Sequence, residues 1–384
     1  MKIAFDNMAL GLPCGNSAYT TGLIKGLAAA FPDNQYHVYS YLKKKKRTQN
    51  AVGNLSAIKI SSVLLHPLIL GKFFSPIANA INYKIMWFSN NNVNKADVYH
   101  CTNPINYTFG MNRTVLTIHD LIALLDEEWV TQGAEAFYNE SISRIISDVD
   151  AIIAVSNHTR SDIIRHFPEA EKKISVVYLG IEERFQYYPQ LDRSFLDTFG
   201  YPQDYPPFLL YVGETQPRKN VHGLITAFAE LPLSIREKYH LVIVGNSRRH
   251  DYKEELLSIV QQRSIKDRVH FYTDVSHNDL VKFYNAAHAF VFPSFYEGFG
   301  IPVAEAMKCG CPVLTSTASS LPEVGGDAAL YAEPNDIDAL KEKLRQIIED
   351  EELRKTLREK GFVQASKFDW KKTAELTYDV YLSI

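Results

Sequence analysis

Short apolar runs alternate with longer amphipathic stretches along most of the chain. The short runs are rich in β-branched and aromatic residues and are bounded by Gly, Pro, Asn or Asp, which predicts buried strands, whereas a 3.6-residue period between them predicts helices. Regular alternation of the two is typical of the α/β class, with parallel sheets covered by helices on both faces. The predicted strands are 3–6, 36–41, 97–101, 115–118, 151–155, 174–177, 208–212, 241–244, 269–272, 289–292, 312–315 and 329–331.

The series of strands is interrupted at residues 181–207, which are rich in proline, tyrosine and acidic residues. This composition predicts a linker with a poorly periodic helix rather than a sheet. We therefore predict two doubly wound domains, for which 384 residues, 46% of them hydrophobic, are sufficient. The expected N-terminal domain spans 1–185 and is completed by a C-terminal helix at 368–384, and the expected C-terminal domain spans 186–367.

The charge of the chain is segregated, although the net charge is only -3. Residues 1–100 contain 11 Lys and Arg against 3 Asp and Glu, whereas the remainder contains 30 against 41. The basic first quarter includes the run 43–47 and, beside it, a helically spaced apolar stripe at 73–88. Such a combination favours an anionic membrane surface as partner, while a solvated basic face and a core helix are the commoner explanations. We expect no nucleic-acid partner.

Cysteine use and the N-terminal pattern favour a cytoplasmic protein. The basic first quarter adds the expectation that the protein contacts the inner face of the plasma membrane peripherally. The four cysteines have neither a disulfide-framework pattern nor a metal-ligand spacing. The first residues enter a strand at once and lack the charged-then-apolar order of a signal peptide, and no apolar run reaches the length of a membrane span. The cysteines are Cys14, Cys101, Cys309 and Cys311.

Residues 293–307 are the most informative segment, because they join a predicted strand to a predicted helix through a glycine-bearing loop. Pro302 marks the start of the helix and Gly310 its end. Gly298 and Gly300 allow the backbone to approach a ligand closely, and the N–H groups at the start of the helix favour a phosphate oxygen. The segment therefore predicts an anion site.

Two carboxylates flank this predicted anion site. Glu297 stands at its entrance and Glu305 about one turn inside the helix, so both can face one molecule while contacting different parts of it. A diphosphate with hydroxyl-rich groups on either side fits such an arrangement. The alternative is an ordinary strand, turn and helix with solvated glutamates.

A second charged segment, residues 213–220, follows the predicted strand 208–212 and precedes a helix beginning near Asn220. A diphosphate leaving group gains negative charge as its bond breaks, so cations fixed at a strand end stabilise the transition state. Arg218 and Lys219 are the candidates, although a surface Arg–Lys pair is normally only solvated.

Candidate residues in the first half stand at the ends of predicted strands. His119 and Asp120 follow strand 115–118, where a lone histidine is otherwise most often structural. Gly15 opens a helix after the first strand, with Asn16 or Ser17 as the predicted N-cap.

The string Asp148-Val149-Asp150 matches the D-x-D pattern with which some enzymes hold a divalent cation. It precedes strand 151–155, on the amino side of the sheet and away from the expected ligand crevice, so a turn at a helix end is the better interpretation. No His/Cys cluster suggests zinc. We expect metal-independent chemistry and no cofactor.

These segments, with Thr117–Leu121 and Ala154–Asn157, resemble the GT-B family of retaining glycosyltransferases with an E-x7-E motif, which includes bacterial polysaccharide and lipopolysaccharide mannosyltransferases. The resemblance covers most of the chain and is strongest from Gly213 to Pro334. It implies two Rossmann-like domains facing each other across a cleft. The sequence departs from the family at Glu214, where many relatives carry a basic residue, and in a loop around Gly15 that has fewer glycines than usual.

The resemblance also implies a role for each candidate residue. The expected catalytic residues are His119, Arg218, Lys219 and Glu297. The expected donor-binding residues are Gly15, Gly213, Arg218, Lys219, Glu297, Gly298, Phe299, Gly300, Ile301 and Glu305, with Glu305 on the ribose. The expected acceptor-binding residues are Asn16, Ser17, Tyr19 and Asp120, with Asp120 alternatively orienting the His119 ring.

The expected function is transfer of a hexose to a glycan or lipid-linked acceptor in cell-surface polysaccharide synthesis, with retention of the anomeric configuration. The expected donor is GDP-mannose, because residues 119–121 and 213–220 resemble those of mannosyltransferases that use it. A UDP-hexose or UDP-N-acetylhexosamine donor is the alternative. Two other classes remain open. A nucleotide-sugar epimerase of the same fold would need no acceptor, and a binding module would lack turnover.

Overall fold

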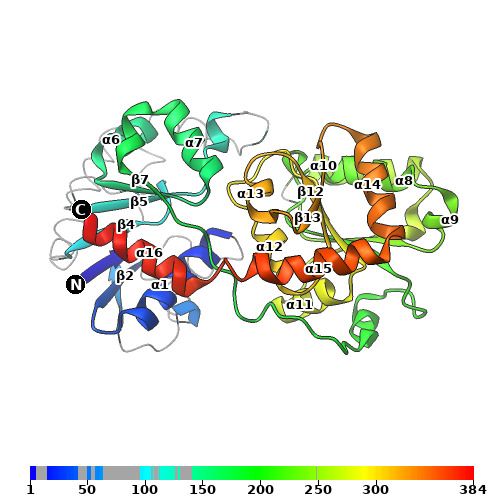
Figure 1. Ribbon diagram of the computed structural model, residues 1–384, viewed down its shortest axis with the longest axis horizontal. Helices are drawn as coiled ribbons and strands as arrows, with labels where there is room; N and C mark the ends of the chain where they lie inside the picture. The colour runs from blue at the N-terminus through cyan, green and yellow to red at the C-terminus, as the bar shows by residue number, and fades with distance from the viewer. Residues whose placement is uncertain are drawn as a thin grey trace. The chain divides into compact units, whose positions relative to one another are not determined.

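The chain forms two compact units in the computed structural model (Figure 1). The structure describes residues 1–5, 15–41, 50–52, 57–63, 96–104, 107, 111, 113–125, 129, 141–247 and 249–384. The first domain comprises Met1–Gly180 with Asp369–Ile384, and the second comprises Ile181–Phe368. The predicted boundary at 185/186 lies a few residues beyond this division.

The first domain contains a parallel sheet whose described strands run in the order β3-β2-β1-β4-β5-β6-β7. Six of these strands lie within one residue of their predicted bounds, because each is a short apolar run between turn-forming residues. The strands are β1 Lys2–Phe5, β2 Gln35–Tyr41, β3 Ile58–Val63, β4 Val98–Cys101, β5 Thr114–Ile118, β6 Ala151–Ala154 and β7 Ile174–Val176.

Strand β3 is absent from the prediction. It lies at the edge of the sheet and pairs only with β2 among the described strands, with Tyr36 opposite Ile58. An edge strand tolerates polar residues such as those of the Ile-Lys-Ile-Ser-Ser-Val run, so its apolar signal is weak. The basic run 43–47 and the apolar stripe 73–88 on either side of it lie outside the described residues.

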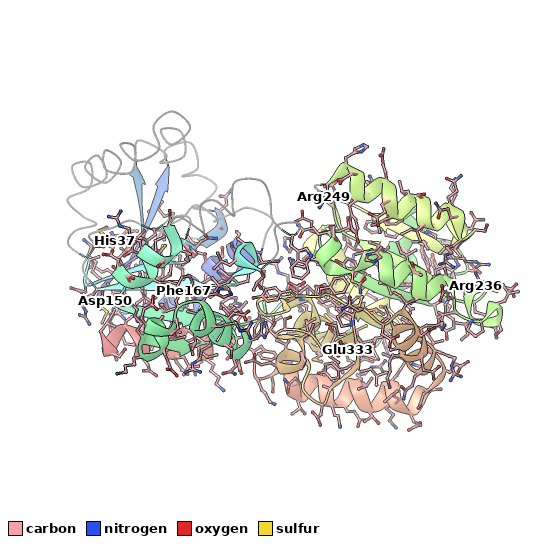
Figure 2. All side chains as sticks on the ribbon, turned by 90° about the horizontal axis from the view of Figure 1, so that it is seen from above. His37, Asp150, Phe167, Arg236, Arg249 and Glu333 are labelled. Atoms are coloured by element: carbon pink, nitrogen blue, oxygen red, sulfur yellow. The ribbon has the colours of Figure 1, made fainter. Side chains whose placement is uncertain are left out.

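Helices cover both faces of the first sheet, as the alternation of side chains along the strands requires. Leu116 and Ile118 face a cluster built with α6 and α7, in which Phe167 is buried (Figure 2). Thr117, between them, faces the other side and contacts Tyr19 of α1. The described helices of this domain are α1 Gly15–Ala30, η4 Ile122–Leu124, α6 Ser143–Asp148, α7 Asn157–His166, η7 Pro168–Lys173 and α16 Trp370–Ser383.

The C-terminal helix α16 belongs to the first domain and lies against α1 (Figure 1). Glycines make this close contact possible. A Cβ atom added at Gly22 would come within 2.2 Å of the Trp370 ring, and one at Gly180 within 2.6 Å. Because packed interiors leave no room for such overlap, a larger residue at either position would push the start of α16 away.

The second domain contains a parallel sheet whose described strands run in the order β10-β9-β8-β11-β12-β13, and all six strands confirm the prediction. Helices α8, α10 and α14 pack together, while α12 packs on α15, as expected for a doubly wound sheet (Figure 1). The strands are β8 Phe208–Val212, β9 His240–Val244, β10 Val269–Tyr272, β11 Ala289–Phe292, β12 Val313–Ser316 and β13 Ala329–Ala332. The helices are η8 Arg193–Phe199, η9 Pro217–Lys219, α8 Val221–Ala229, α9 Leu233–Arg236, α10 His250–Gln262, η10 Lys266–Arg268, α11 His277–Ala286, α12 Ile301–Lys308, α13 Leu321–Gly325, α14 Ile337–Glu349 and α15 Glu351–Ala365.

Residues 181–207 contain the short helix η8 and no strand, as predicted, and they belong to the second domain. Phe185 and Leu196 are buried, and the Phe185 ring packs on Tyr284 with centroids 5.9 Å apart. The aromatic residues that make the segment irregular in sequence thus anchor it by burial. Within the described part of the chain, no helix combines the length and the apolar character needed to cross a bilayer.

Candidate active site

The second domain brings two cations and one carboxylate together at the point where the strand order reverses, between β8 and β11. In doubly wound sheets the ligand crevice lies at this point, outside the carboxyl ends of the strands. The loop after β8 contains Arg218 and Lys219, and the loop after β11 contains Glu297. The topology therefore brings together two segments that lie far apart in sequence, since Lys219 and Glu297 are 78 residues apart.

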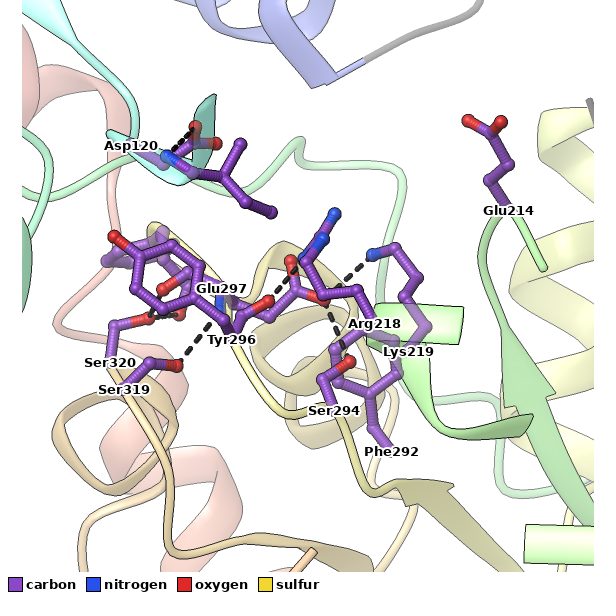
Figure 3. A network of polar contacts seen from close by, with 12 residues as sticks. Asp120, Glu214, Arg218, Lys219, Phe292, Ser294, Tyr296, Glu297, Ser319 and Ser320 are labelled. Carbon is purple, nitrogen blue, oxygen red and sulfur yellow. Dashed lines mark hydrogen bonds and ion pairs between the residues drawn. The ribbon is translucent and has the colours of Figure 1, made fainter. Parts of the chain in front are cut away.

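Arg218, Lys219 and Glu297 form one charged cluster (Figure 3). Glu297 Oε1 lies 2.8 Å from Lys219 Nζ and 3.2 Å from Arg218 Nη1, and it accepts a hydrogen bond of 2.9 Å from the Ser294 hydroxyl. The side chains of the three charged residues are only 12% to 14% exposed. Two cations against one carboxylate leave a local excess of positive charge, which suits an anionic ligand.

The electrostatics of the cluster fix its protonation. Burial opposes ionisation of Glu297, but the charges of Lys219 and Arg218 outweigh it and hold the pKa of this carboxyl at about 2. Burial lowers the pKa of Lys219, while Glu297 acts in the opposite direction. Glu297 is therefore an anion at neutral pH and can accept hydrogen bonds from hydroxyl groups, but it is a poor source of a proton.

Asn220 fixes the turn that carries the two cations. It is fully buried and adopts the left-handed conformation at φ 55°, between η9 and α8. Its amide donates hydrogen bonds to the carbonyls of Pro293 at 3.2 Å and Pro334 at 2.7 Å. Phe295 N–H also donates to the Arg218 carbonyl at 2.9 Å. The loops after β8, β11 and β13 are thus joined through one side chain.

Two serines hold the loop around Glu297 from below (Figure 3). Glu297 N–H donates to Ser319 Oγ at 2.9 Å. Ser320 Oγ lies 2.9 Å from the Glu297 carbonyl and 2.8 Å from the Phe299 carbonyl, and it donates to these oxygens. The Phe299 side chain is buried against Phe368, with ring centroids 5.3 Å apart, so the ring has a packing role.

Helix α12 begins and ends where the sequence predicts. Gly300 precedes it at φ 104°, and a Cβ atom there would come within 2.8 Å of Leu321, so only glycine fits this turn. Pro302 lies in the first turn, and Gly310 follows the helix in the left-handed region at φ 70°. Gly298 and Ile301 lie in the same connection between β11 and the helix.

Glu305 on α12 has a different environment from Glu297. Its carboxylate accepts a hydrogen bond of 2.9 Å from the Tyr284 hydroxyl of α11. Burial raises the pKa of Glu305 to about 7, and the hydrogen bond from Tyr284 only partly opposes this rise. The two glutamates of the motif are therefore not equivalent: one stays ionised and the other exchanges its proton near neutral pH.

Gly213 and Gly245 end neighbouring strands in an unusually close approach. Gly213 has φ 147° and Gly245 φ 148°. A Cβ atom at Gly245 would lie 2.0 Å from the Gly213 carbonyl oxygen, so the approach requires glycine. Glu214, where the family resemblance predicts a basic residue, stands apart from the charged cluster (Figure 3). Arg218 and Lys219 supply the positive charge of this site without it.

In the first domain, His119 stands at the carboxyl end of β5. Its Nε2 lies 3.2 Å from the Thr102 carbonyl oxygen, and its ring packs edge-on against Tyr19 with centroids 4.8 Å apart. Burial lowers the pKa of His119 to about 4, so the ring is neutral. Since a carbonyl can only accept, Nε2 carries the proton and Nδ1 is an acceptor.

Thr102 and Tyr19 contact the His119 ring, a role that the sequence predicted for Asp120 only as an alternative to binding the acceptor. The Asp120 carboxylate instead accepts a hydrogen bond of 3.2 Å from Ile122 N–H. The short Asp120 side chain reaches the backbone two residues ahead, as is usual in such turns, rather than the ring of its neighbour.

The predicted N-cap of α1 at Asn16 or Ser17 is wrong. The helix begins at Gly15, so both residues lie in its first turn, where the Asn16 carbonyl accepts from Thr20 Oγ1 at 2.9 Å. Ser17 and Tyr19 are buried, and Tyr19 OH lies 2.8 Å from Thr117 Oγ1. Tyr19 therefore secures the end of β5 beside His119.

Asp148 and Asp150 occupy a turn at the end of a helix, as predicted. Asp148 is the last residue of α6 and accepts a hydrogen bond of 2.5 Å from the Tyr107 hydroxyl. Asp150 accepts from Thr114 N–H at 2.6 Å, on the amino side of the sheet (Figure 2 labels Asp150). Both carboxylates thus have local hydrogen-bonding partners at the edge opposite the carboxyl ends of the strands.

Residue patterns alone did not identify the residues that support the charged cluster. Asn220 ends the Arg-Lys-Asn run, and an asparagine directly before a predicted helix is a signal for a left-handed or capping position. Ser294, adjacent to the motif, carries a weaker signal. Ser319, Ser320 and Tyr284 are distant in sequence and carry no recognisable signal.

Comparisons of the sequence with known proteins identify the family of the chain. Two family profiles match the chain: Glycosyl transferases group 1 over residues 199–364 and Glycosyltransferase Family 4 over residues 15–185. O-antigen chain mannosyltransferase B of Escherichia coli is 34% identical over 272 residues, covering 71% of this chain and 70% of the relative. Serotype-specific mannosyltransferase WbdA of Escherichia coli is 29% identical over 70% of this chain. WbdA is longer, and the matched region covers 33% of it.

Solved structures share the fold over the whole chain. The Anabaena protein HepE in complex with UDP and glucose has a TM-score of 0.75 and 18% identity, with 100% of both chains covered. WaaG, a glycosyltransferase involved in lipopolysaccharide biosynthesis, has a TM-score of 0.71 and 20% identity, with 99% of both chains covered. The chain therefore belongs to the glycosyl transferases of group 1 and is a glycosyltransferase with two Rossmann-like domains of the GT-B type.

Proposed function

We propose that this glycosyltransferase transfers mannose from GDP-mannose to a glycan or lipid-linked acceptor in the synthesis of a cell-surface polysaccharide. The relatives named as O-antigen and serotype-specific mannosyltransferases support the sugar and the pathway. The observation that carries the proposal is the buried cluster of two cations and one ionised carboxylate at the switch point of the second sheet. A nucleotide sugar offers both a diphosphate for the cations and hydroxyl groups for the carboxylate.

In the proposed reaction, Arg218 and Lys219 neutralise the charge that develops on the leaving diphosphate. Glu297, held ionised by the same two cations, accepts hydrogen bonds from the donor sugar and so fixes its orientation. Glu305 binds the ribose. His119 is neutral, and its unprotonated Nδ1 can accept a hydrogen bond from a sugar hydroxyl.

Retention of configuration and independence from metal ions are parts of the same proposal. Because Glu297 has a pKa of about 2, it is unsuited to deprotonate the acceptor hydroxyl. The leaving diphosphate then takes that proton as the new glycosidic bond forms on the face from which it departs. Positive charge comes from Arg218, Lys219 and the start of α12, and we propose that it replaces a divalent cation.

Membrane association remains a proposal that rests on sequence alone. The basic run 43–47 and the apolar stripe 73–88 supply cationic and apolar groups of the kind that bind an anionic bilayer. Replacing Lys43, Lys44, Lys45 and Lys46 with Gln should release the protein from anionic vesicles and preserve transfer to an acceptor analogue that is free in solution.

A donor panel tests the proposed function. Binding and turnover are measured with GDP-mannose, UDP-glucose and UDP-N-acetylglucosamine, each with and without a mannose-terminated acceptor, and NMR gives the anomeric configuration of the product. We expect GDP-mannose to be preferred, turnover to require the acceptor, and the new bond to retain the donor configuration. Preference for a UDP-sugar would overturn the donor assignment, and conversion of the donor without acceptor would favour an epimerase.

A further inference from the structure

A second basic site lies at the amino edge of the second sheet, away from the charged cluster. A cavity of about 390 Å³ opens where Pro207 leads into β8 and where Ala287 and His288 lead into β11. The Arg218–Lys219–Glu297 cluster lies beyond the other ends of the same two strands, so a strand length separates the two places. Cations dominate the lining, which includes Arg193, Arg354, Lys355 and Arg358 with one acidic residue, Glu351.

The arginines of this basic cavity are held by backbone carbonyls rather than by carboxylates. Arg354 Nη1 donates to the carbonyls of Ile347 at 2.9 Å and Ile348 at 2.7 Å, at the end of α14. Arg193 donates to the Tyr205 carbonyl at 3.0 Å and the Ala286 carbonyl at 3.1 Å. Carbonyls orient a guanidinium but leave its charge uncompensated.

The third arginine follows the same pattern. Arg358 Nε donates to the Gly310 carbonyl at 2.8 Å, and its guanidinium lies 5.9 Å from the centre of the Tyr187 ring. Among the described residues, none of the four cations of the basic cavity forms an ion pair. The bonds to carbonyls engage only Nη1 of Arg354 and Nε of Arg358, so other guanidinium N–H groups of both residues remain for a ligand.

The positive potential of the arginines affects the protonation of His288, which also lines the cavity. Burial lowers its pKa, and the charges of Arg354, Arg193 and Arg358 lower it further, to about 4. The imidazole is therefore neutral, with Nε2 3.3 Å from the Ile348 carbonyl. Three arginines that act together on one neutral ring create the kind of field that favours a multiply charged anion.

We propose that the basic cavity binds a small phosphorylated molecule, as a site separate from the donor site. Planar guanidinium groups with several fixed N–H donors match phosphate oxygens in geometry and charge. A volume of about 390 Å³ falls within the range of small-molecule sites and accommodates more than a single ion. The ligand chemistry is a phosphate ester or a pyrophosphate, both of which present several charged oxygens.

The test must separate this site from the cluster that binds the donor. Isothermal titration calorimetry with inorganic pyrophosphate is therefore carried out at low salt on the full chain carrying Arg218→Gln and Lys219→Gln, which disable the cluster. We expect pyrophosphate binding to persist in this background. Adding Lys355→Gln and Arg358→Gln should weaken it at least tenfold, because two charge-assisted contacts are lost. Since Arg358→Gln also removes the bond to Gly310, Lys355→Gln alone is a second variant, expected to weaken binding severalfold.

Lys360→Gln is the matched control, because Lys360 lies on the same helix but pairs with Asp327 at 3.0 Å and does not line the cavity. It should leave the affinity unchanged. Equal affinity in the cavity variants, or an equal loss in Lys360→Gln, would overturn the proposal. Titration with a hexose monophosphate distinguishes the two kinds of ligand. Tighter binding of the hexose monophosphate than of pyrophosphate identifies the site as one for a phosphate ester, and weaker binding identifies it as one for a pyrophosphate. Failure of the donor panel would leave this result untouched, since the background lacks the donor cluster.

Discussion

Asn220 offers a quantitative test of how the active-site turn is built. Replacing it with Ala removes the amide that donates to the Pro293 and Pro334 carbonyls. Two buried hydrogen bonds contribute roughly 0.5–1.5 kcal/mol each. Alanine at φ 55° adds about 1 kcal/mol of left-handed strain. Asn220→Ala should therefore destabilise the second domain by about 2–4 kcal/mol.

Companion variants separate the two contributions. Asn220→Gly loses the hydrogen bonds but adopts the left-handed conformation freely, so it should be about 1 kcal/mol more stable than Asn220→Ala. Asn220→Asp keeps the shape but turns a carboxylate oxygen toward two carbonyls, and it should be the least stable at neutral pH. Asn285→Ala is the control at a partly exposed position of the same domain, and it should cost about 1 kcal/mol. It removes two amide–carbonyl bonds of 2.9 Å and the bond of 2.6 Å that Tyr188 N–H donates to Asn285 Oδ1.

The assay must report on the second domain by itself. The three tryptophans, Trp87, Trp129 and Trp370, all lie outside residues 181–368, so their fluorescence does not follow it. Hydrogen exchange of peptides from β8, β11 and α8, measured by mass spectrometry, gives the opening free energy locally. Turnover should also fall at least tenfold in Asn220→Ala, because the Arg218–Lys219 turn loses its anchor. Unchanged exchange and turnover in Asn220→Ala would refute this account of the turn.

Four further predictions address the chemistry and its pH dependence. Lys219→Ala should lower kcat about a hundredfold or more with the fold intact, and normal turnover in the folded variant would contradict its proposed role. Glu305→Gln should weaken binding of the free nucleoside diphosphate, whereas Glu297→Gln should mainly weaken binding of the sugar-bearing donor, and equal effects in titrations of the free nucleotide would argue against this division. Transfer should survive EDTA, so a loss that Mg²⁺ or Mn²⁺ restores would reopen a metal-dependent reaction. Burial lowers the pKa of His119 and of His240 to about 4 in the folded protein, against about 6.5 when unfolded. The unfolded chain therefore binds more protons between these values, and stability should fall as the pH drops from about 6.5 to 4, which denaturant titrations at several pH values would detect.

The sequence predicted the fold well because most strands are short, strongly apolar and bounded by turn-forming residues. β8 and β11 are fully buried parallel strands, and their apolar runs are continuous. β3 was not predicted because its polar and apolar residues alternate, as is common in an edge strand, and because a longer apolar segment follows it in the sequence. Residues 181–207 show a related limit: their composition predicts irregular structure but not burial, and Phe185 and Leu196 have no regular period, yet both are buried.

The candidate site was predictable where chemistry and turn type coincide in a short segment. Arg218, Lys219 and Glu297 follow strands directly, and parallel topology brings strand ends together. The partner of Glu305 could not be predicted, because Tyr284 is a buried helix residue 21 positions away and nothing in the sequence relates the two. The contacts of the His119 ring could not be predicted either, because Thr102 and Tyr19 belong to other segments of the first domain.

The return of the chain to the first domain imposes an order on biosynthesis. Helix α16, which carries Trp370 against Gly22 and Gly180, is made only after all of residues 181–368. At about 5–20 residues per second, a ribosome needs roughly 10–40 s to add that segment. Until then the glycine-lined face of α1 has no partner, so a nascent chain must carry an incomplete first domain while the second is synthesised. Chaperone dependence should therefore be concentrated in the domain that is translated first and completed last.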